Sequence, residues 1–324
     1  MFRYVAPGEG EIMAFSELSS LAKEMYLRTQ IGQLQAVYSA SQAKLRALLR
    51  TILTDFQRIR AEAILKQVNQ IVASLNTQVY RWAKNSLPQA YERGIDLAAE
   101  RLSALGVTRF VKYDAEIHTA AVNVLVDDVT IELLMANDSI SKYFNRVIRQ
   151  TQQRLIEDAE ISRQIAEGLI QGEARKTVSD AILKTLRQQM GNEQFIVING
   201  RNYRPDSYAS LIARTRTREA TSQGTINTSL RYGVDLVQWD SHFEPCEYCQ
   251  QFSGRVFSIS GNDDRFPELT ERPPLHPNCK CVITPITRES LEKRGYLEEI
   301  VKLSNSPLIE VDSFSRFEEV LASL

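Results

Sequence analysis

The sequence predicts an α+β protein that is mainly α, with a long helical N-terminal region followed by a small α+β module closed by a Cys/His cluster. The first 204 residues contain only Pro7 and Pro88, whereas the last 120 contain the other eight prolines. Because proline lacks an N–H and its ring clashes inside a helix, this asymmetry favours helices first and loops later. All four cysteines lie within the 36 residues from Cys246 to Cys281.

Length and charge limit the class of protein. A chain of 324 residues is long enough for two or three domains and for a core that needs no disulfides. Its 39 Lys+Arg against 40 Asp+Glu exclude the global basic field of a dedicated nucleic-acid binder. Residues 1–14 lack the apolar core of a signal peptide, and no run of about 18 uncharged apolar residues occurs. We therefore expect a protein made in a cytoplasm, with no membrane partner.

Apolar residues recur at intervals of three and four from Leu45 to Trp82, which predicts at least one long amphipathic helix. A break near Ala61 to Ala63 is the alternative to one continuous helix. Further helices are expected at Leu87–Leu105, Asp114–Met135 and Ser139 to about Met190, the last interrupted near Gly168 and Gly172. These stripes are typical of a bundle core, and a partner-binding surface is the other interpretation.

The pattern changes at Gly191, where we place a domain boundary. Alternating apolar residues run into Asn199-Gly200, which predicts a β-hairpin over about Gln194 to Arg204. A helix capped by Asp206 or Ser207 should follow and end at Gly233. Its expected inward residues are Tyr208, Leu211, Ile212, Thr215, Ile226 and Leu230. A strand over Val234 to Trp239 and a short excursion over Gln250 to Arg272 complete the module, which gives domains at 1–190, 191–288 and 289–324.

Four arginines of this helix are candidate contacts for nucleic acid or a protein partner: Arg214, Arg216, Arg218 and Arg231. At 100° per residue Arg214 and Arg218 share a face, whereas Arg216 faces elsewhere and can reach Glu219 at i+3. A solvated, self-paired face is the plainer interpretation. Phosphate contact and burial against the loops of the same module are the alternatives.

The cysteines and a histidine form two half-sites with metal-ligand spacing. Cys246 and Cys249 make a CxxC pair, and His276 and Cys279 repeat that spacing before Cys281. A CxxC turn brings two thiolates to one cation, so the sequence predicts a structural zinc site on Cys246, Cys249, Cys279 and either Cys281 or His276. Reduced thiols without metal and one or two disulfides remain alternatives.

Read in order, these motifs resemble a known family. This region is similar to the C-terminal module of phage Mu F-like minor head proteins and phage minor capsid proteins. The resemblance lies in the order of four features: the helix with TRTREATSQG, a strand ending at Trp239, the segment CEYCQQFSGRVFSISG and then PPLHPNCKCVITPI. The resemblance covers about Pro205 to Pro285, a quarter of the chain. It implies a virion protein in several copies at or near the portal vertex, incorporated during procapsid assembly in the host cytoplasm and aiding genome packaging or delivery.

Its implied partners are the portal protein and the major capsid or scaffolding protein, with phage DNA as a further one. Two other functions stay open: a zinc-stabilised DNA-binding module resting on the four arginines, and an enzyme using the arginine-rich helix with His242 or His276. We expect no enzyme, because paired carboxylates and a phosphate-cradling glycine loop are missing from the sequence. From Glu289 onward eight acidic residues stand against four basic ones, which favours an acidic helical tail that docks on protein. Helices are expected there at Leu291–Leu303 and Phe314–Leu324.

Overall fold

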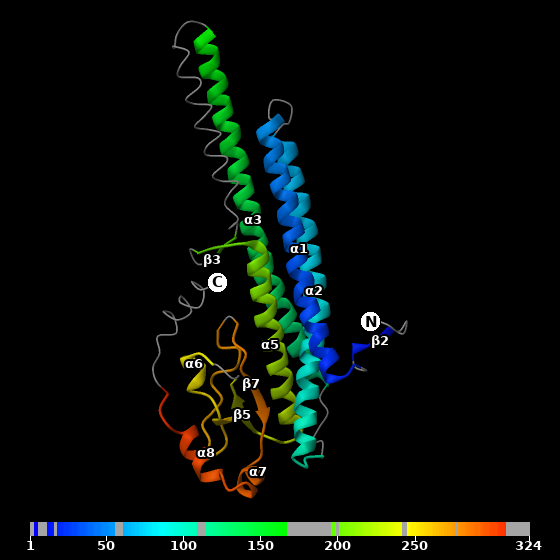
Figure 1. Cartoon of the computed structure of the whole chain (residues 1–324), viewed down its shortest axis with the longest axis vertical. Helices are drawn as coiled ribbons and strands as arrows, with labels where there is room; N and C mark the ends of the chain where they lie inside the picture. Colours follow the sequence, from blue (N-terminus) through cyan, green and yellow to red (C-terminus); the bar gives the residue numbers. More distant parts are fainter. Residues whose placement is uncertain are drawn as a thin grey trace. The chain divides into compact units, whose positions relative to one another are not determined.

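The computed structural model describes residues 3–5, 12–15, 18–55, 61–108, 115–166, 196–198, 201–241, 245–276 and 278–308. Long helices dominate this part of the chain (Figure 1): α1 (Ser20–Asp55), α2 (Ala61–Ala104), α3 (Ala115–Ala166) and α5 (Pro205–Arg231). A small antiparallel sheet and a Cys/His cluster follow, which confirms the expected fold class. Among the described residues, no helix has the length and apolar character needed to cross a membrane.

The chain divides into two compact units, each assembled from segments far apart in the sequence. Unit 1 contains Met1–Ile31, Trp82–Val129 and Leu211–Leu324, and unit 2 contains Gly32–Arg81 and Thr130–Ser210. The domain limits expected from the sequence, after residues 190 and 288, stay predictions.

In unit 2, segments of three helices bury apolar side chains at intervals of three, four and seven residues, the pattern of packed amphipathic helices. Buried members include Leu34, Tyr38, Leu45, Ile64, Val68, Leu75, Val79, Leu133, Ile140 and Phe144. The hairpin predicted between Gln194 and Arg204 is confirmed, since β3 (Ile196–Ile198) pairs antiparallel with β4 (Arg201–Tyr203). At the other end of the chain, β1 (Arg3–Val5) and β2 (Ile12–Ala14) form a hairpin that the sequence did not predict, because three-residue strands leave too little alternation to detect.

Two helix boundaries expected from the sequence are wrong. Helix α2 continues through Pro88, where a new helix was expected to begin, and the flanking Leu87 and Ala90 are fully buried. Helix α3 continues through residues 136–138, where Asn137 is fully buried and its Nδ2 donates to Asn76 Oδ1 at 2.7 Å. In both places burial outweighs the local preference of proline and asparagine for helix ends. The interruptions expected near Gly168 and Gly172 lie outside the described residues.

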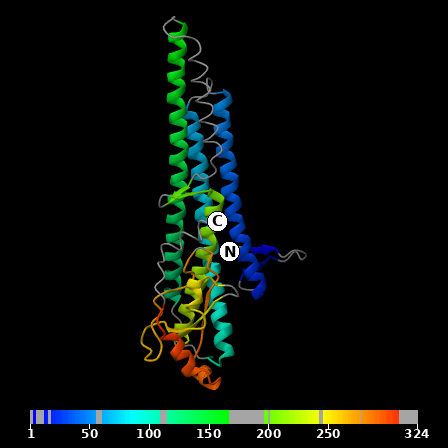
Figure 2. The ribbon, with the colours of Figure 1, turned by 60° about the vertical axis from the view of Figure 1, so that its left-hand side comes forward.

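Unit 1 is organised around a close crossing of α2 and α5, which lie side by side in both views (Figures 1 and 2). A Cβ on Gly94 would lie 2.0 Å from the Thr221 carbonyl oxygen, and one on Gly224 would lie 2.2 Å from that of Tyr91. The two backbones therefore touch where both residues lack a side chain. Thr221 Oγ1 donates to the Ala90 carbonyl at 3.0 Å, and Thr225 Oγ1 to that of Gly94 at 3.2 Å.

Helix α5 begins one residue before the expected caps, with Pro205 in its first turn, where the missing N–H costs nothing. At the other end Gly233, with φ of 73°, ends it as predicted, and the Val234 N–H returns to the Ser229 carbonyl. Val234 therefore belongs to the helix end, and the strand begins later, as β5 (Leu236–Asp240). The inward face is correct for Tyr208, Leu211, Ile212 and Ile226, whereas Leu230 is exposed and Thr215 is half-buried.

Strand β5 is the centre of a three-stranded sheet with the order β6-β5-β7. Both β6 (Val256–Ser258) and β7 (Val282–Pro285) pair antiparallel with it. The single helix expected at Leu291–Leu303 is instead two, α7 (Arg288–Lys293) and α8 (Leu297–Ser304), because Gly295 with φ of 76° ends the first. Leu291, Leu297 and Ile300 pack with Leu236 and Val256 of the sheet, so this part of the acidic segment is built into the module. The helix expected at Phe314–Leu324 lies outside the described residues.

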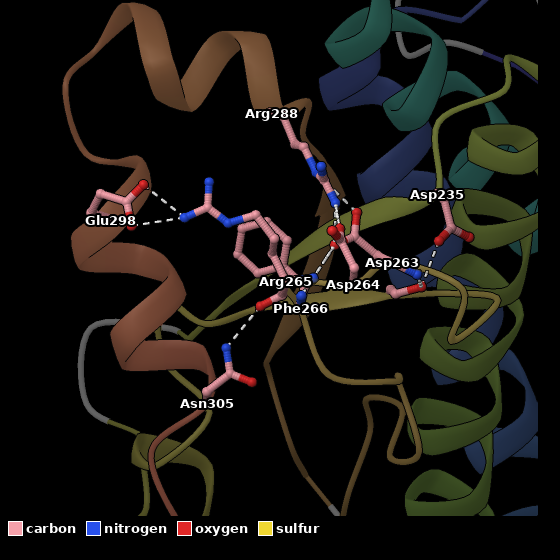
Figure 3. A network of polar contacts seen from close by, with 9 residues as sticks. Asp235, Asp263, Asp264, Arg265, Phe266, Arg288, Glu298 and Asn305 are labelled. Atoms are coloured by element: carbon pink, nitrogen blue, oxygen red, sulfur yellow. Dashed lines mark hydrogen bonds and ion pairs between the residues drawn. The ribbon is translucent and has the colours of Figure 1, made fainter.

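A polar network holds the loop after β6 to α7 and α8 (Figure 3). Arg288 donates to Asp263 at 2.7 Å and also pairs with Asp264, and Arg265 binds Glu298 at 2.7 Å. Burial opposes ionisation of Asp263, but the hydrogen bonds from Arg288 and from the N–H groups of Arg265 and Phe266 prevail and lower its pKa. The carboxylate thus stays charged and keeps the loop folded.

The glycine crossing gives a direct test of how unit 1 is built. Gly224→Ala places a methyl group against the Tyr91 carbonyl, so we expect the free energy of unfolding to fall by about 3 kcal/mol. Gly32→Ala is the matched control, since nothing lies within 4 Å of its Cβ in α1, and it should stabilise the protein by about 0.5–1 kcal/mol. Urea denaturation measures both changes, and equal stability of the two variants would refute the close crossing.

Candidate metal centre

The first half of the cluster is formed at the start of α6 (Glu247–Gln250). Cys246 is the N-cap residue of this helix, and its Sγ accepts the N–H of Cys249 at 3.4 Å. The CxxC spacing therefore folds into a single turn in which the first thiol caps the backbone beside the second. Cys249 is buried and Cys246 is half-buried.

The second half is a tight turn that leads into β7. The Cys279 N–H donates to the His276 carbonyl at 3.0 Å, and Asn278 between them adopts a φ of 64°. Asparagine is one of the few side chains that tolerates this left-handed conformation. The turn directs the His276 ring back toward α6, and Cys281 follows immediately before β7.

The five predicted ligands come together as two overlapping groups of three that share Cys249. One group is Cys246, Cys249 and His276, and the other is Cys249, Cys279 and Cys281; within each, the ligand atoms lie within 4.8 Å of one another. The His276 Nε2 lies 3.3 Å from the Cys246 Sγ and 3.2 Å from the Cys249 Sγ. The Cys249 and Cys279 Sγ atoms are 3.8 Å apart.

These separations fit a shared metal ion. Metal–sulfur bonds of about 2.3 Å in a tetrahedron separate two sulfurs by about 3.8 Å, and a sulfur and a nitrogen by somewhat less. The three pairs just given match that spacing, and within each group of three the ligand atoms are close enough to bind one ion. The Cys281 Sγ lies close to those of Cys249 and Cys279 and 3.8 Å from the Ser241 Oγ. The cluster could therefore hold a metal ion.

The cluster lies in the apolar core of the module. Trp239 and Phe252 stack with ring centroids 4.8 Å apart, and both pack with Cys249, Cys279 and Cys281. Hydrogen bonding to Cys279 and Cys281, together with burial, raises the pKa of the Cys249 thiol, whereas hydrogen bonds from Cys249 and Cys279 lower the pKa of Cys281. When thiols lie this close together in an apolar core, the pKa of one thiol rises while that of its neighbour falls. A bound cation would stabilise all of them as thiolates.

The structure separates the four candidate arginines. Arg216 pairs with Glu219 at 2.7 Å, as predicted for i+3 neighbours. Arg218 donates to the carbonyl of Cys279, so it contacts a loop of its own module, which was one of the alternatives for these arginines. Arg231 instead lies 2.7 Å from the Nε2 of His118, whose Nδ1 is 2.7 Å from the Tyr91 hydroxyl. The contact with His118 was not predictable from the sequence, because it joins α3 to α5 across more than a hundred residues.

Comparison with known protein families identifies one that spans most of the helices and part of the metal site. The family model described as phage minor capsid protein 2 matches residues 43–271, well over half of the chain. The chain belongs to the phage minor capsid protein 2 family. No curated protein and no solved structure matches it.

Membership of this family supports a structural role for the chain in the phage head. The match is wider than the resemblance seen in the sequence, because it includes α2 and α3, where only general helical character had been recognised. It also ends before His276, so it covers the CxxC half of the cluster and not the second half.

Cys249 belongs to both groups of ligands, so its substitution tests the cluster most severely. Cys249→Ser should abolish binding of divalent metal and lower the melting temperature by about 5 °C or more, because metal binding to a folded site adds to folding stability. Ser253→Ala, an exposed position of the same module outside the two ligand groups, is the control and should retain the metal. Elemental analysis and thermal unfolding measure the two effects, and metal retained by Cys249→Ser would contradict the assignment.

Proposed function

We propose that this minor capsid protein is built into the phage head at or near the portal vertex during procapsid assembly in the host cytoplasm, in several copies per particle. The observation that carries the proposal is the family match across residues 43–271. In this role it contacts the portal protein and the major capsid or scaffolding protein, and it aids genome packaging or delivery.

A candidate contact surface for such a partner lies on α3 in unit 2. Ile131 and Met135 are 57% and 63% exposed, and together with Leu134 and Tyr143 they line a shallow hollow beside Lys142 and Arg146. Large apolar side chains that lie together in water are typical of a protein-binding surface. Their polar neighbours supply the rim that such surfaces have.

The test is incorporation into particles assembled from the portal, scaffolding and major capsid proteins of the same phage. Mass spectrometry of purified procapsids should detect the wild-type protein, and the double variant Ile131→Glu, Met135→Glu should be largely excluded because charges would be desolvated on docking. Asp128→Ala, exposed on the same helix, is the control and should be incorporated normally. Absence of the wild-type protein from the particles would overturn the proposal.

We further propose that the metal is zinc and that Cys246, Cys249, His276 and Cys279 hold it, with Cys281 in place of His276 as the alternative. Support comes from the donor set and from the two groups of three ligand atoms that share Cys249. Four protein ligands around one zinc leave no position for a substrate, so the ion's contribution is to hold α6 and the turn before β7 together. Near one zinc per chain is expected by elemental analysis, and a zinc-free protein with reduced or disulfide-bonded cysteines would refute it.

We propose no catalytic activity for the chain. The enzyme hypothesis required His242 or His276 as a base beside the arginine-rich helix. The ring nitrogen of His276 is directed at two thiols, and His242 lies outside the described residues. The family, a structural one, supports the same conclusion.

A further inference from the structure

A cavity of about 740 Å³ lies within unit 1. Its walls come from the first turns of α1, from α2 around Arg93, from the middle of α5, and from β7 with Lys280 and Cys281 before it. This volume is within the range of about 300–1,000 Å³ typical of sites that bind small molecules and cofactors. The cavity is therefore large enough for a ligand of nucleotide size.

Positive charge dominates the lining of this cavity. Among the residues that the structure describes, five cationic side chains line it, and Glu24 is the one acidic side chain. The cationic residues are Arg28, Arg93, Arg214, Arg218 and Lys280. They come from four separate elements, so the positive charge is concentrated only when the chain folds.

Arg93 is the most constrained of these cations. It is only 8% exposed, and its Nη2 donates to Ser20 Oγ at 2.5 Å, while its Nε and Nη1 are buried and have no hydrogen-bond partner among the described residues. The Nε of Arg214 is likewise buried without one. Buried guanidinium N–H groups without acceptors are costly, and an anion in the cavity supplies the missing acceptors.

Nearby carboxylates do not neutralise this charge. Glu24 pairs with Arg28 at 3.2 Å, and Asp96 pairs with Lys23 at 2.5 Å. Among the residues that the structure describes, Arg93, Arg214, Arg218 and Lys280 have no carboxylate within salt-bridge distance; these four are the cavity cations named below. Burial lowers the pKa of Arg218, and the charges of Arg214 and Arg28 act in the same direction, against those of Cys279 and Glu24.

The remaining lining contains threonine, serine and cysteine side chains and an apolar part: Leu27, Ile31, Leu97, Val282, Ile283 and Pro285. We propose that the cavity binds a phosphate-bearing ligand of nucleotide size, with its phosphates on the cavity cations and its base or sugar against this apolar wall. Several uncompensated cations within one cavity match the charge density of a di- or triphosphate, or of successive phosphates on a strand. A single carboxylate group supplies too little charge to neutralise them.

Isothermal titration calorimetry on the full-length protein tests this with three probes: ATP, inorganic triphosphate and a short single-stranded oligothymidylate. At least one of them should bind, and Arg214→Gln should weaken that binding by about tenfold or more. Lys280→Gln, at an exposed position, should weaken it as well and covers the case in which a buried change disturbs folding. Arg216→Gln is the matched control, since this arginine of the same helix pairs with Glu219 and does not line the cavity, and it should leave affinity unchanged.

The probes also distinguish the source of the phosphate. Binding of ATP at least as tight as that of the oligonucleotide indicates a free nucleotide, whereas much tighter binding of the oligonucleotide indicates a nucleic-acid strand. The proposal is overturned if no probe binds, if the Arg214 and Lys280 variants bind as well as the control, or if an oligoglutamate peptide binds more tightly than every phosphate probe. These outcomes are independent of whether the protein enters procapsids.

Discussion

The close approach of α2 and α5 at Gly94 and Gly224 is the constraint on which unit 1 depends. With hydrogen in place of a side chain at both positions, α2 and α5 approach until each backbone touches the other, and Thr221 and Thr225 fix the register through carbonyls of α2. Arg93 is the neighbour of Gly94, and Arg214 and Arg218 lie on the same helix as Gly224, earlier in the chain. The crossing therefore brings these arginines to one cavity.

Arg218 connects this crossing to the Cys/His cluster, because it extends from α5 to the carbonyl of Cys279 while it also lines the cavity. The segment from Lys280 to Pro285 has the same double position: it follows the second half of the cluster, pairs with β5 and forms a wall of the cavity. A metal bound to the cluster would hold this wall in place. The proposed zinc site and the proposed phosphate site are thus parts of one body, although their ligands share no side chain.

Features that depend on residues close together in the sequence were predictable, whereas features that depend on tertiary contacts were not. Asn199-Gly200 predicted the hairpin, Gly233 the end of α5 and the Cys/His spacing the cluster, because each depends on residues close together in the chain. Pro88 and Asn137 suggested helix ends that do not occur, because burial of the surrounding side chains outweighs the preference of proline and asparagine for helix ends. Arg93 gave no signal, since its role depends on residues more than a hundred positions away. Among the cluster ligands, spacing alone left His276 and Cys281 equal, and the structure places His276 beside Cys246 and Cys249 and Cys281 beside Cys249 and Cys279.

Hydrogen–deuterium exchange, followed by mass spectrometry with and without a metal chelator, tests most directly whether the crossing, the cluster and the cavity form one cooperative body. We predict that chelation increases exchange in β5 and β7 and also in α5 between Thr217 and Thr225, while the unit 2 segment of α3 keeps its protection. Increased exchange limited to residues 245–281, with α5 unchanged, would show that the cluster folds independently of the helices and would contradict this account.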